Sequence, residues 1–235
     1  MNIDKKIVKN PTVADPIKTF WHNITKTEPY WSVLTNERWK VDNINPSEFY
    51  RTGDQTVASI FSKYHLEDID TCLDFGCGVG RITAALAGKA NHVDALDIST
   101  GMIKIAKSYM EDQNITNVTL VDTSKDTDFL SNQKGKYDLV FSSLVLQHNP
   151  LPRAKRLLGQ LCLSISKTGF AVIHIHRHLQ SSTHPSVSHS MQMHQMPLDE
   201  AKKTIKQSGC RLIRHDDALP TNGNIGCLLY IGREQ

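Results

Sequence analysis

The chain has 235 residues, of which 39% are apolar and 22% charged, as expected for a soluble globular protein with a sizeable core. Its 27 basic and 24 acidic side chains leave a net charge of +3, which argues against nucleic acid or another polyanion as the partner. No apolar run approaches the roughly 18 residues of a membrane span, and the first residues lack the apolar core of a secretory signal, so we expect a cytoplasmic protein.

Five cysteines are scattered along the chain without a C-x-x-C pair: Cys72, Cys77, Cys162, Cys210 and Cys227. An odd set of this kind is typical of reduced, buried thiols in a reducing compartment.

Residues 1–45 contain all three tryptophans and little alternation of apolar and polar residues. This pattern predicts short helices and irregular turns that pack over the rest of the protein as a cap segment. Residues 46–235 are expected to form one domain. A helix begins this domain at Pro46, with Asn45 or Ser47 as its N-cap, and Gly53 is expected to break or bend it early.

Strands and helices then alternate along the chain. Apolar runs predict strands at 69–75, 91–99, 117–124, from 137 onward, at 169–176, and two more around the turn "PTNGN" at 220–224. Helical spacing predicts helices at 79–88, 99–113, 150–166 and 198–209. The order predicts an α/β fold with a doubly wound, mostly parallel seven-stranded sheet that ends in an antiparallel β-hairpin.

The first strand leads into "DFGCGVG", where Gly76, Gly78 and Gly80 occupy three of five positions. Glycines cluster where the chain turns sharply or where another group comes close to the backbone. The cluster is compatible with a plain strand-to-helix turn and with a bound nucleotide-type cofactor. The glycines alone do not decide between them.

Polar residues follow the ends of the other parallel strands, where ligands bind in open sheets of this kind. Asp97 ends the second strand, 21 residues after Gly76, and an acidic side chain there can accept hydrogen bonds from both hydroxyls of a ribose. Asp122 and Thr123 follow the third strand, and the fourth ends near Ser142.

A dinucleotide-dependent oxidoreductase would show part of this pattern. Its fingerprint is G-x-G-x-x-G, however, whereas the spacing here is G-x-G-x-G and the next residue is Arg81. The first strand also carries Asp74 just before the loop, and a buried carboxylate there would suit the amine of a ligand.

At these residues the sequence resembles the class I S-adenosylmethionine-dependent methyltransferases. "LDFGCGVG" matches the first motif of that family, D/E-x-G-x-G-x-G, while "VDALDIS" and "LVDTS" match its second and third, and the resemblance covers residues 46–235. It implies S-adenosylmethionine as the cofactor, with Asp97 at the ribose, Ile98 on the adenine, and Asp122 and Thr123 at the adenine edge. The positions expected at the cofactor are Asp74, Gly76, Cys77, Gly78, Gly80, Asp97, Ile98, Met102, Asp122, Thr123 and Ser142.

Such an enzyme mainly aligns a nucleophile with an activated methyl group, and it needs a base only for a hydroxyl or a protonated amine. His148, in "LVLQHNP", is the candidate base, although it could equally cap or pack on the next helix. The family members that methylate amino groups of nucleic acid or glutamine carry N/D-P-P-Y/F after the fourth strand, where this chain has "SSLV". We therefore expect a small-molecule acceptor, such as a glycan or a secondary-metabolite intermediate, methylated on oxygen or nitrogen.

Six of the eleven histidines fall between residues 174 and 194: His174, His176, His178, His184, His189 and His194. The first three alternate along the fifth strand and are expected to share one face. Because no carboxylate or cysteine accompanies them at ligand spacing, we expect no metal, and we place His174 and His176 at the acceptor.

Aromatic and basic residues near the start of the chain could close over the site. Tyr30 and Trp31 are candidates for the acceptor and Arg51 for the cofactor's carboxylate, which a guanidinium suits. Tyr50 belongs to the same group, and packing of an N-terminal helix on the sheet explains these residues as well. A non-catalytic module that uses the fold only to bind the cofactor also remains open.

Overall fold

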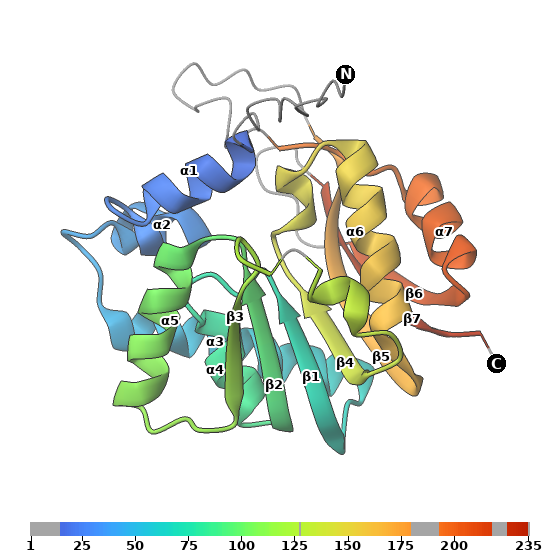
Figure 1. The fold of residues 1–235 in the computed structure, drawn as a ribbon, viewed down its shortest axis with the longest axis horizontal. Coiled ribbons are helices and arrows are strands. Elements are labelled where there is room, and N and C mark those ends of the chain that lie inside the picture. Colours follow the sequence, from blue (N-terminus) through green and yellow to red (C-terminus); the bar gives the residue numbers. More distant parts are fainter. Residues whose placement is uncertain (1–14, 127, 180–192, 218–224, 235) are drawn as a thin grey trace, which may run out of the picture.

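The computed structural model describes residues 15–126, 128–179, 193–217 and 225–234 (Figure 1). Its centre is one seven-stranded sheet in the order β3-β2-β1-β4-β5-β7-β6. The strands are β1 Ile69–Phe75, β2 Ala90–Asp97, β3 Val118–Asp122, β4 Tyr137–Ser142, β5 Ile165–His178, β6 Cys210–Asp217 and β7 Ile225–Arg233. The α-helices are α1 Pro16–Ile24, α2 Pro29–Val33, α3 Pro46–Tyr64, α4 Arg81–Ala87, α5 Thr100–Asp112, α6 Leu151–Ser164 and α7 Leu198–Gln207.

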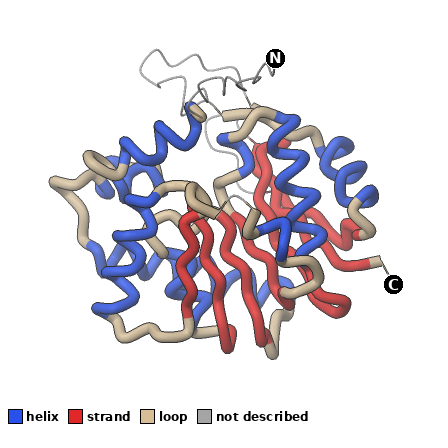
Figure 2. Tube along the Cα trace, in the orientation of Figure 1, coloured by secondary structure: helices blue, strands red, loops and turns tan. Residues whose placement is uncertain are grey.

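The pairing of the strands confirms the predicted fold class. Strands β1 to β5 pair in parallel, and β7 runs antiparallel to both β5 and β6. In Figure 2 the strands form one twisted layer with helices on both sides. The predicted "PTNGN" turn lies outside the described residues.

Two apolar clusters fill the two faces of the sheet. Alternate residues of a strand point to opposite faces, and Val172 of β5 belongs to the cluster under α3 and α4, whereas Ile173 belongs to the one under α6 and α7. All five cysteines are buried and free, as the sequence predicts.

Helix α3 shows why one glycine was misread. The Asn45 side chain caps it by accepting a hydrogen bond from the Glu48 N–H (3.3 Å), and the helix continues through Gly53 to Tyr64. A Cβ at Gly53 would lie 2.1 Å from the Arg81 carbonyl oxygen, so the glycine lets α3 approach the start of α4. The prediction of an early break at Gly53 is wrong.

The N-terminal helices lie over the carboxyl ends of the parallel strands (Figure 1). Helix α1 bridges the starts of α5 and α6, because Ser99 donates a hydrogen bond to the Trp21 carbonyl (2.9 Å) and Arg153 pairs with Asp15 (2.6 Å). The division of the chain at residue 45 stays a prediction. Among the described helices, none is both long and apolar enough to cross a membrane.

Candidate active site

The glycine loop between β1 and α4 has left-handed backbone at all three glycines. Gly76, Gly78 and Gly80 have φ angles of +81°, +55° and +84°. A Cβ at Gly76 would lie 2.2 Å from Val145, and one at Gly80 would lie 2.8 Å from Met110. Backbone conformation and protein packing therefore account for two of these glycines without any ligand.

Asp97, at the end of β2, ties the loop to the neighbouring strand. Its Oδ2 accepts the N–H of Gly78 (2.9 Å) and its Oδ1 accepts the N–H of Ser99 (2.8 Å). The N–H groups of Gly76 and Cys77 donate to the Leu96 carbonyl, at 2.8 and 2.9 Å. Each Asp97 oxygen keeps a further lone pair, so the carboxylate can still accept hydrogen bonds from a ligand.

Asp74 is a buried carboxylate beside this loop, and Asp97 is a half-buried one. Asp74 is 2% exposed and accepts a hydrogen bond from the Thr83 hydroxyl (2.6 Å). Burial raises the pKa of Asp74 to about 6, against the opposing influence of Thr83 and Arg81. Burial likewise raises the pKa of Asp97 to about 6, although the N–H groups of Ser99 and Gly78 oppose it. Both groups are ionised at neutral pH, but their ionised forms are costly.

The end of β3 brings the predicted adenine-side residues next to Asp97. Thr123 donates both its N–H (2.9 Å) and its hydroxyl (3.1 Å) to the Asp97 carbonyl. Asp122 accepts the Thr100 hydroxyl (2.7 Å) and the Ser124 N–H (3.0 Å). Burial raises the pKa of Asp122, but these hydrogen bonds outweigh it and hold the pKa below its usual value.

Three other predicted cofactor residues make contacts within the protein. Met102 is 1% exposed and packs in a cluster with Phe49 and Val79, and the Cys77 thiol is buried. The hydroxyl of Ser142 donates to the Phe75 carbonyl (3.0 Å), between β4 and β1. Their assignment to the cofactor stays a prediction.

Arg51, which the sequence suggested for the cofactor's carboxylate, is exposed, whereas Arg81 is buried. Arg51 lies on the exposed side of α3, and its place at the cofactor's carboxylate stays a prediction. Arg81 is 5% exposed, contacts the Thr52 hydroxyl (3.3 Å), and its charge stabilises ionised Asp74. Burial lowers the pKa of Arg81 to about 10. Its place directly after the last glycine is the sequence signal that could have identified it.

His148 closes the short 3-10 turn Leu146–His148 that follows β4. Its ring meets Trp21 of α1 edge-on, with ring centroids 5.1 Å apart. The pKa of His148 is lowered to about 4, mainly by burial and also by the nearby His176 and His194. The imidazole is therefore neutral at pH 7.

His174 and His176 lie side by side on β5, with ring centroids 4.9 Å apart, and are 7% and 9% exposed. Burial lowers the pKa of His174 to about 4, and it also lowers that of His176. The β5–β7 register shifts between His176 and His178, and His178 is exposed. The prediction that all three share one face is therefore wrong for His178.

The other three histidines between residues 174 and 194 are the remaining candidates for metal ligands. His184 and His189 lie outside the described residues, while the N–H of His194 donates to the Gln147 carbonyl (2.6 Å). Within the described ranges, the one set of three side chains close enough to share an ion is elsewhere, on β6 and β7: His215, Asp217 and Cys227. The expectation that the protein holds no metal stays a prediction.

The aromatic residues near the start of the chain pack with one another. Tyr30 meets Phe49 edge-on at 5.1 Å, and Tyr50 stacks on Tyr109 and donates its hydroxyl to the Val79 carbonyl (2.8 Å). Trp31 is half-buried in α2. These contacts agree with the packing explanation for Tyr50, and an acceptor role for Tyr30 and Trp31 stays a prediction.

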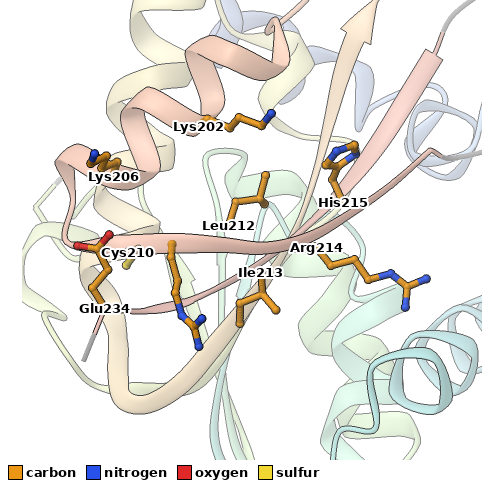
Figure 3. Close-up of a pocket in the computed structure, with 9 residues that line it drawn as sticks. Lys202, Lys206, Cys210, Leu212, Ile213, Arg214, His215 and Glu234 are labelled. Atoms are coloured by element: carbon orange, nitrogen blue, oxygen red, sulfur yellow. The ribbon is translucent and has the colours of Figure 1, made fainter.

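A separate surface cleft lies between α7 and the edge strand β6 (Figure 3). Its lining is mostly basic and includes Lys202, Lys206, Arg211, Arg214 and His215, with Glu234 at one end. Since β6 is at the opposite edge of the sheet from β3, this cleft is not part of the site around the glycine loop.

Comparison with known proteins finds similarity to methyltransferases. Residues 72–169 match a family model described as a methyltransferase domain. Two curated relatives are a ubiquinone biosynthesis O-methyltransferase of Paraburkholderia phytofirmans, 29% identical over 99 residues, and a probable ribosomal RNA small subunit methyltransferase A of Methanosphaera stadtmanae, 30% identical over 115 residues. These matches cover 42% and 49% of this chain, and 40% and 41% of the relatives, so the chain spans less than half of their length.

A crystal structure of magnesium protoporphyrin IX methyltransferase from Synechocystis PCC 6803, with bound S-adenosylhomocysteine, has the same fold. It superposes with a TM-score of 0.67 at 20% identity, covering 93% of this chain and all of that one. Motifs, strand order and family model agree: the chain is similar to the class I S-adenosylmethionine-dependent methyltransferases and has their fold.

Proposed function

We propose that the protein binds S-adenosylmethionine over the glycine loop and transfers its methyl group to a small-molecule acceptor. The observation that carries this proposal is the pair of hydrogen bonds from Gly78 and Ser99 to Asp97. They bring the first two family motifs together and fix the carboxylate at the end of β2. The cofactor, when bound, supplies an activated methyl group on a sulfonium.

The chain's own residues would bind the cofactor in three places. The free lone pairs of Asp97 would accept the ribose hydroxyls. Ile98 would pack on the adenine, with Asp122 and Thr123 at its edge. Asp74, ionised at neutral pH although its pKa is raised to about 6, would attract the ammonium group. Arg51 remains the proposed partner of the carboxylate and would have to turn toward the loop.

The acceptor would bind beside His148 at the ends of β4 and β5. Helices α1 and α2 lie over the carboxyl ends of the parallel strands. The sequence "SSLV" at residues 142–145 differs from the signature of the enzymes that methylate nucleic acid or glutamine. Both observations favour a small molecule over a polymer. Since His148 is neutral at pH 7, it could receive a proton from the acceptor.

The test is to incubate the purified protein with isotopically methyl-labelled S-adenosylmethionine and a metabolite extract, and to identify labelled products by mass spectrometry. We expect a labelled small molecule that is absent when Asp97→Ala replaces the wild-type protein. No transfer by a protein that binds S-adenosylhomocysteine would instead support a non-catalytic binding module. Binding of NAD in its place would support an oxidoreductase.

A further inference from the structure

Four buried polar atoms without a hydrogen-bond partner lie close together at the ends of β4 and β5. They are Oε1 of Gln147 and Nδ1 of His148, His174 and His176. We call these four residues the histidine cluster. An unpaired buried polar group destabilises the folded protein, so four in one place need an explanation. A bound ligand that supplies the missing partners would provide it.

The backbone holds the histidine cluster from several sides. Strands β4 and β5 are parallel neighbours, so the turn that carries Gln147 and His148 follows directly beside His174 and His176. The N–H of Met196 donates to the His176 carbonyl (2.7 Å), and that of His194 to the Gln147 carbonyl (2.6 Å). The cluster is thus a fixed part of the fold, and Trp21 covers His148.

The surroundings of the histidine cluster are neutral. Burial is the largest cause of the lowered pKa of His148, His174 and His176, and the other contributions come from neighbouring histidines alone. No carboxylate or guanidinium of the described residues contributes to the shift of these three pKa values. An ammonium acceptor would therefore lack a counter-ion here, and so would a carboxylate. A neutral imidazole offers one donor and one acceptor, which suits hydroxyl groups.

The histidine rings are also poorly arranged for a metal. Within the described part of the chain, their nitrogens do not form a set of three close enough to share one ion, unlike His215, Asp217 and Cys227. Hydrogen bonding to a ligand therefore explains the unpaired nitrogens better than coordination does.

Resting on the proposed function, we infer that the histidine cluster binds a neutral, hydroxyl-bearing molecule and that the enzyme methylates one of its oxygens. A bond forms between the hydroxyl oxygen and the methyl carbon while the bond from that carbon to sulfur breaks, its electron pair remaining on sulfur. The hydroxyl proton passes to Nδ1 of His148. The products are a methyl ether, S-adenosylhomocysteine and an imidazolium that later loses its proton to water.

Gln147 would set the proton positions on His148. The Gln147 amide lies 3.5 Å from Nε2 of His148. Amide oxygen and nitrogen are interchangeable by a simple flip. With Oε1 facing the ring, it accepts the Nε2 proton, and Nδ1 is left with the lone pair that the reaction needs. Gln147 is thus a positioning residue, and after the flip its amide nitrogen takes the unpaired position.

The first experiment follows the label itself. Wild-type protein is given S-adenosylmethionine with a ¹³C-methyl group, together with a metabolite extract and two matched sets of acceptors: phenol, aniline and benzoate, and glucose, glucosamine and glucuronate. The two sets distinguish an aromatic from a sugar ring. We expect the label in a methyl ether, identified by NMR and mass spectrometry. Label on nitrogen, sulfur or a carboxylate would overturn the inference while leaving the proposed function intact. No transfer to any compound would contradict the proposed function itself.

The second experiment tests the cluster on the acceptor found in this way. His174→Leu and His176→Leu should each lower kcat/KM at least about tenfold, and His174→Asn and His176→Asn, which keep a polar atom near Nδ1, should recover most of it. S-adenosylhomocysteine affinity should not change in any of them, and exposed His215→Ala is the matched control. Leucine variants with wild-type kcat/KM would overturn the inference. Loss of activity in EDTA with recovery in Zn²⁺ would do the same.

Discussion

The site at the carboxyl ends of the parallel strands has two halves, and they bury titratable groups of different kinds. At β1 and β2, burial raises the pKa of Asp74 and of Asp97 to about 6. At β4 and β5, burial lowers the pKa of His148 and of His174 to about 4. The same physical cause favours the neutral form in each case. At pH 7 the first half nevertheless carries negative charge while the second is neutral, which suits a cationic cofactor beside an uncharged acceptor.

The halves also differ in how far the protein satisfies its own polar groups. Both Asp97 oxygens accept backbone N–H groups, whereas Nδ1 of His148, His174 and His176 has no partner. The cofactor half is therefore organised before any ligand binds. The acceptor half is completed only by its ligand.

The largest effect should come from removing the base in the acceptor half. His148→Ala is expected to lower kcat by on the order of 10²–10⁴ with little change in cofactor affinity. His148→Gln keeps hydrogen bonding but no basicity, so it separates orientation from proton transfer. If the glutamine variant keeps most of the activity in steady-state assays, His148 only positions the acceptor.

The next largest effect should come from the cofactor half. Asp97→Ala removes the proposed acceptor of the ribose hydroxyls and leaves the N–H groups of Gly78 and Ser99 unpaired. We expect binding of S-adenosylhomocysteine to weaken by ~2–3 kcal/mol in calorimetry. Asp97→Asn, which has the same shape, separates lost charge from a disturbed loop. Unchanged affinity in both variants would remove Asp97 from the site.

The pH dependence of binding and of catalysis should differ between the halves. Asp74 and Asp97 lose their charge as the pH falls through about 6, so the Kd of S-adenosylhomocysteine should rise below that pH, by up to about tenfold per pH unit for each carboxylate. His148 accepts a proton only near pH 4, so kcat at saturating cofactor should stay level from pH 8 down to about 5. An unperturbed imidazole would instead place a step near pH ~6.5. A step in kcat at that pH would contradict the neutral acceptor half.

The smallest effect concerns stability, where the halves oppose each other. Between pH 4 and 6.5 the unfolded chain protonates His148 and His174 while the native protein does not, so they make stability rise with pH. Between pH 3.8 and 6 the native protein protonates Asp74 while the unfolded chain does not, so it makes stability fall with pH. Asp74→Asn should therefore make the free energy of unfolding rise more steeply from pH 5 to pH 6 than in the wild type, by up to about 1.4 kcal/mol. Urea unfolding at the two pH values measures this, and an unchanged slope would show that Asp74 has an ordinary pKa.

The sequence predicted most of the fold class, because the alternation of strands and helices follows from local patterns. Apolar runs marked the strands, and Asn45 caps α3 as expected. It failed where the reason lies in distant contacts. Gly53 reads as a break until the carbonyl of Arg81 is seen against it, and the register shift after His176 depends on β7.

For the site, the motifs predicted which loop and strand ends meet but not what each residue does there. Met102 and Ser142 have the right spacing, yet the structure gives both an internal packing or hydrogen-bonding role. The burial of Arg81 was not predicted, because it depends on the approach of α3, whose Thr52 hydroxyl accepts a hydrogen bond from the guanidinium. The coverage of His148 by Trp21 depends on the path of α1, which no local pattern specifies.

The proposed function depends first on a site for S-adenosylmethionine at the glycine loop and Asp97. The most direct measurement is calorimetric titration of the wild-type protein with S-adenosylhomocysteine and, in parallel, with NAD. The account predicts saturable binding of one S-adenosylhomocysteine per chain and no binding of NAD. Heat of binding from NAD but not from S-adenosylhomocysteine, or from neither, would contradict it.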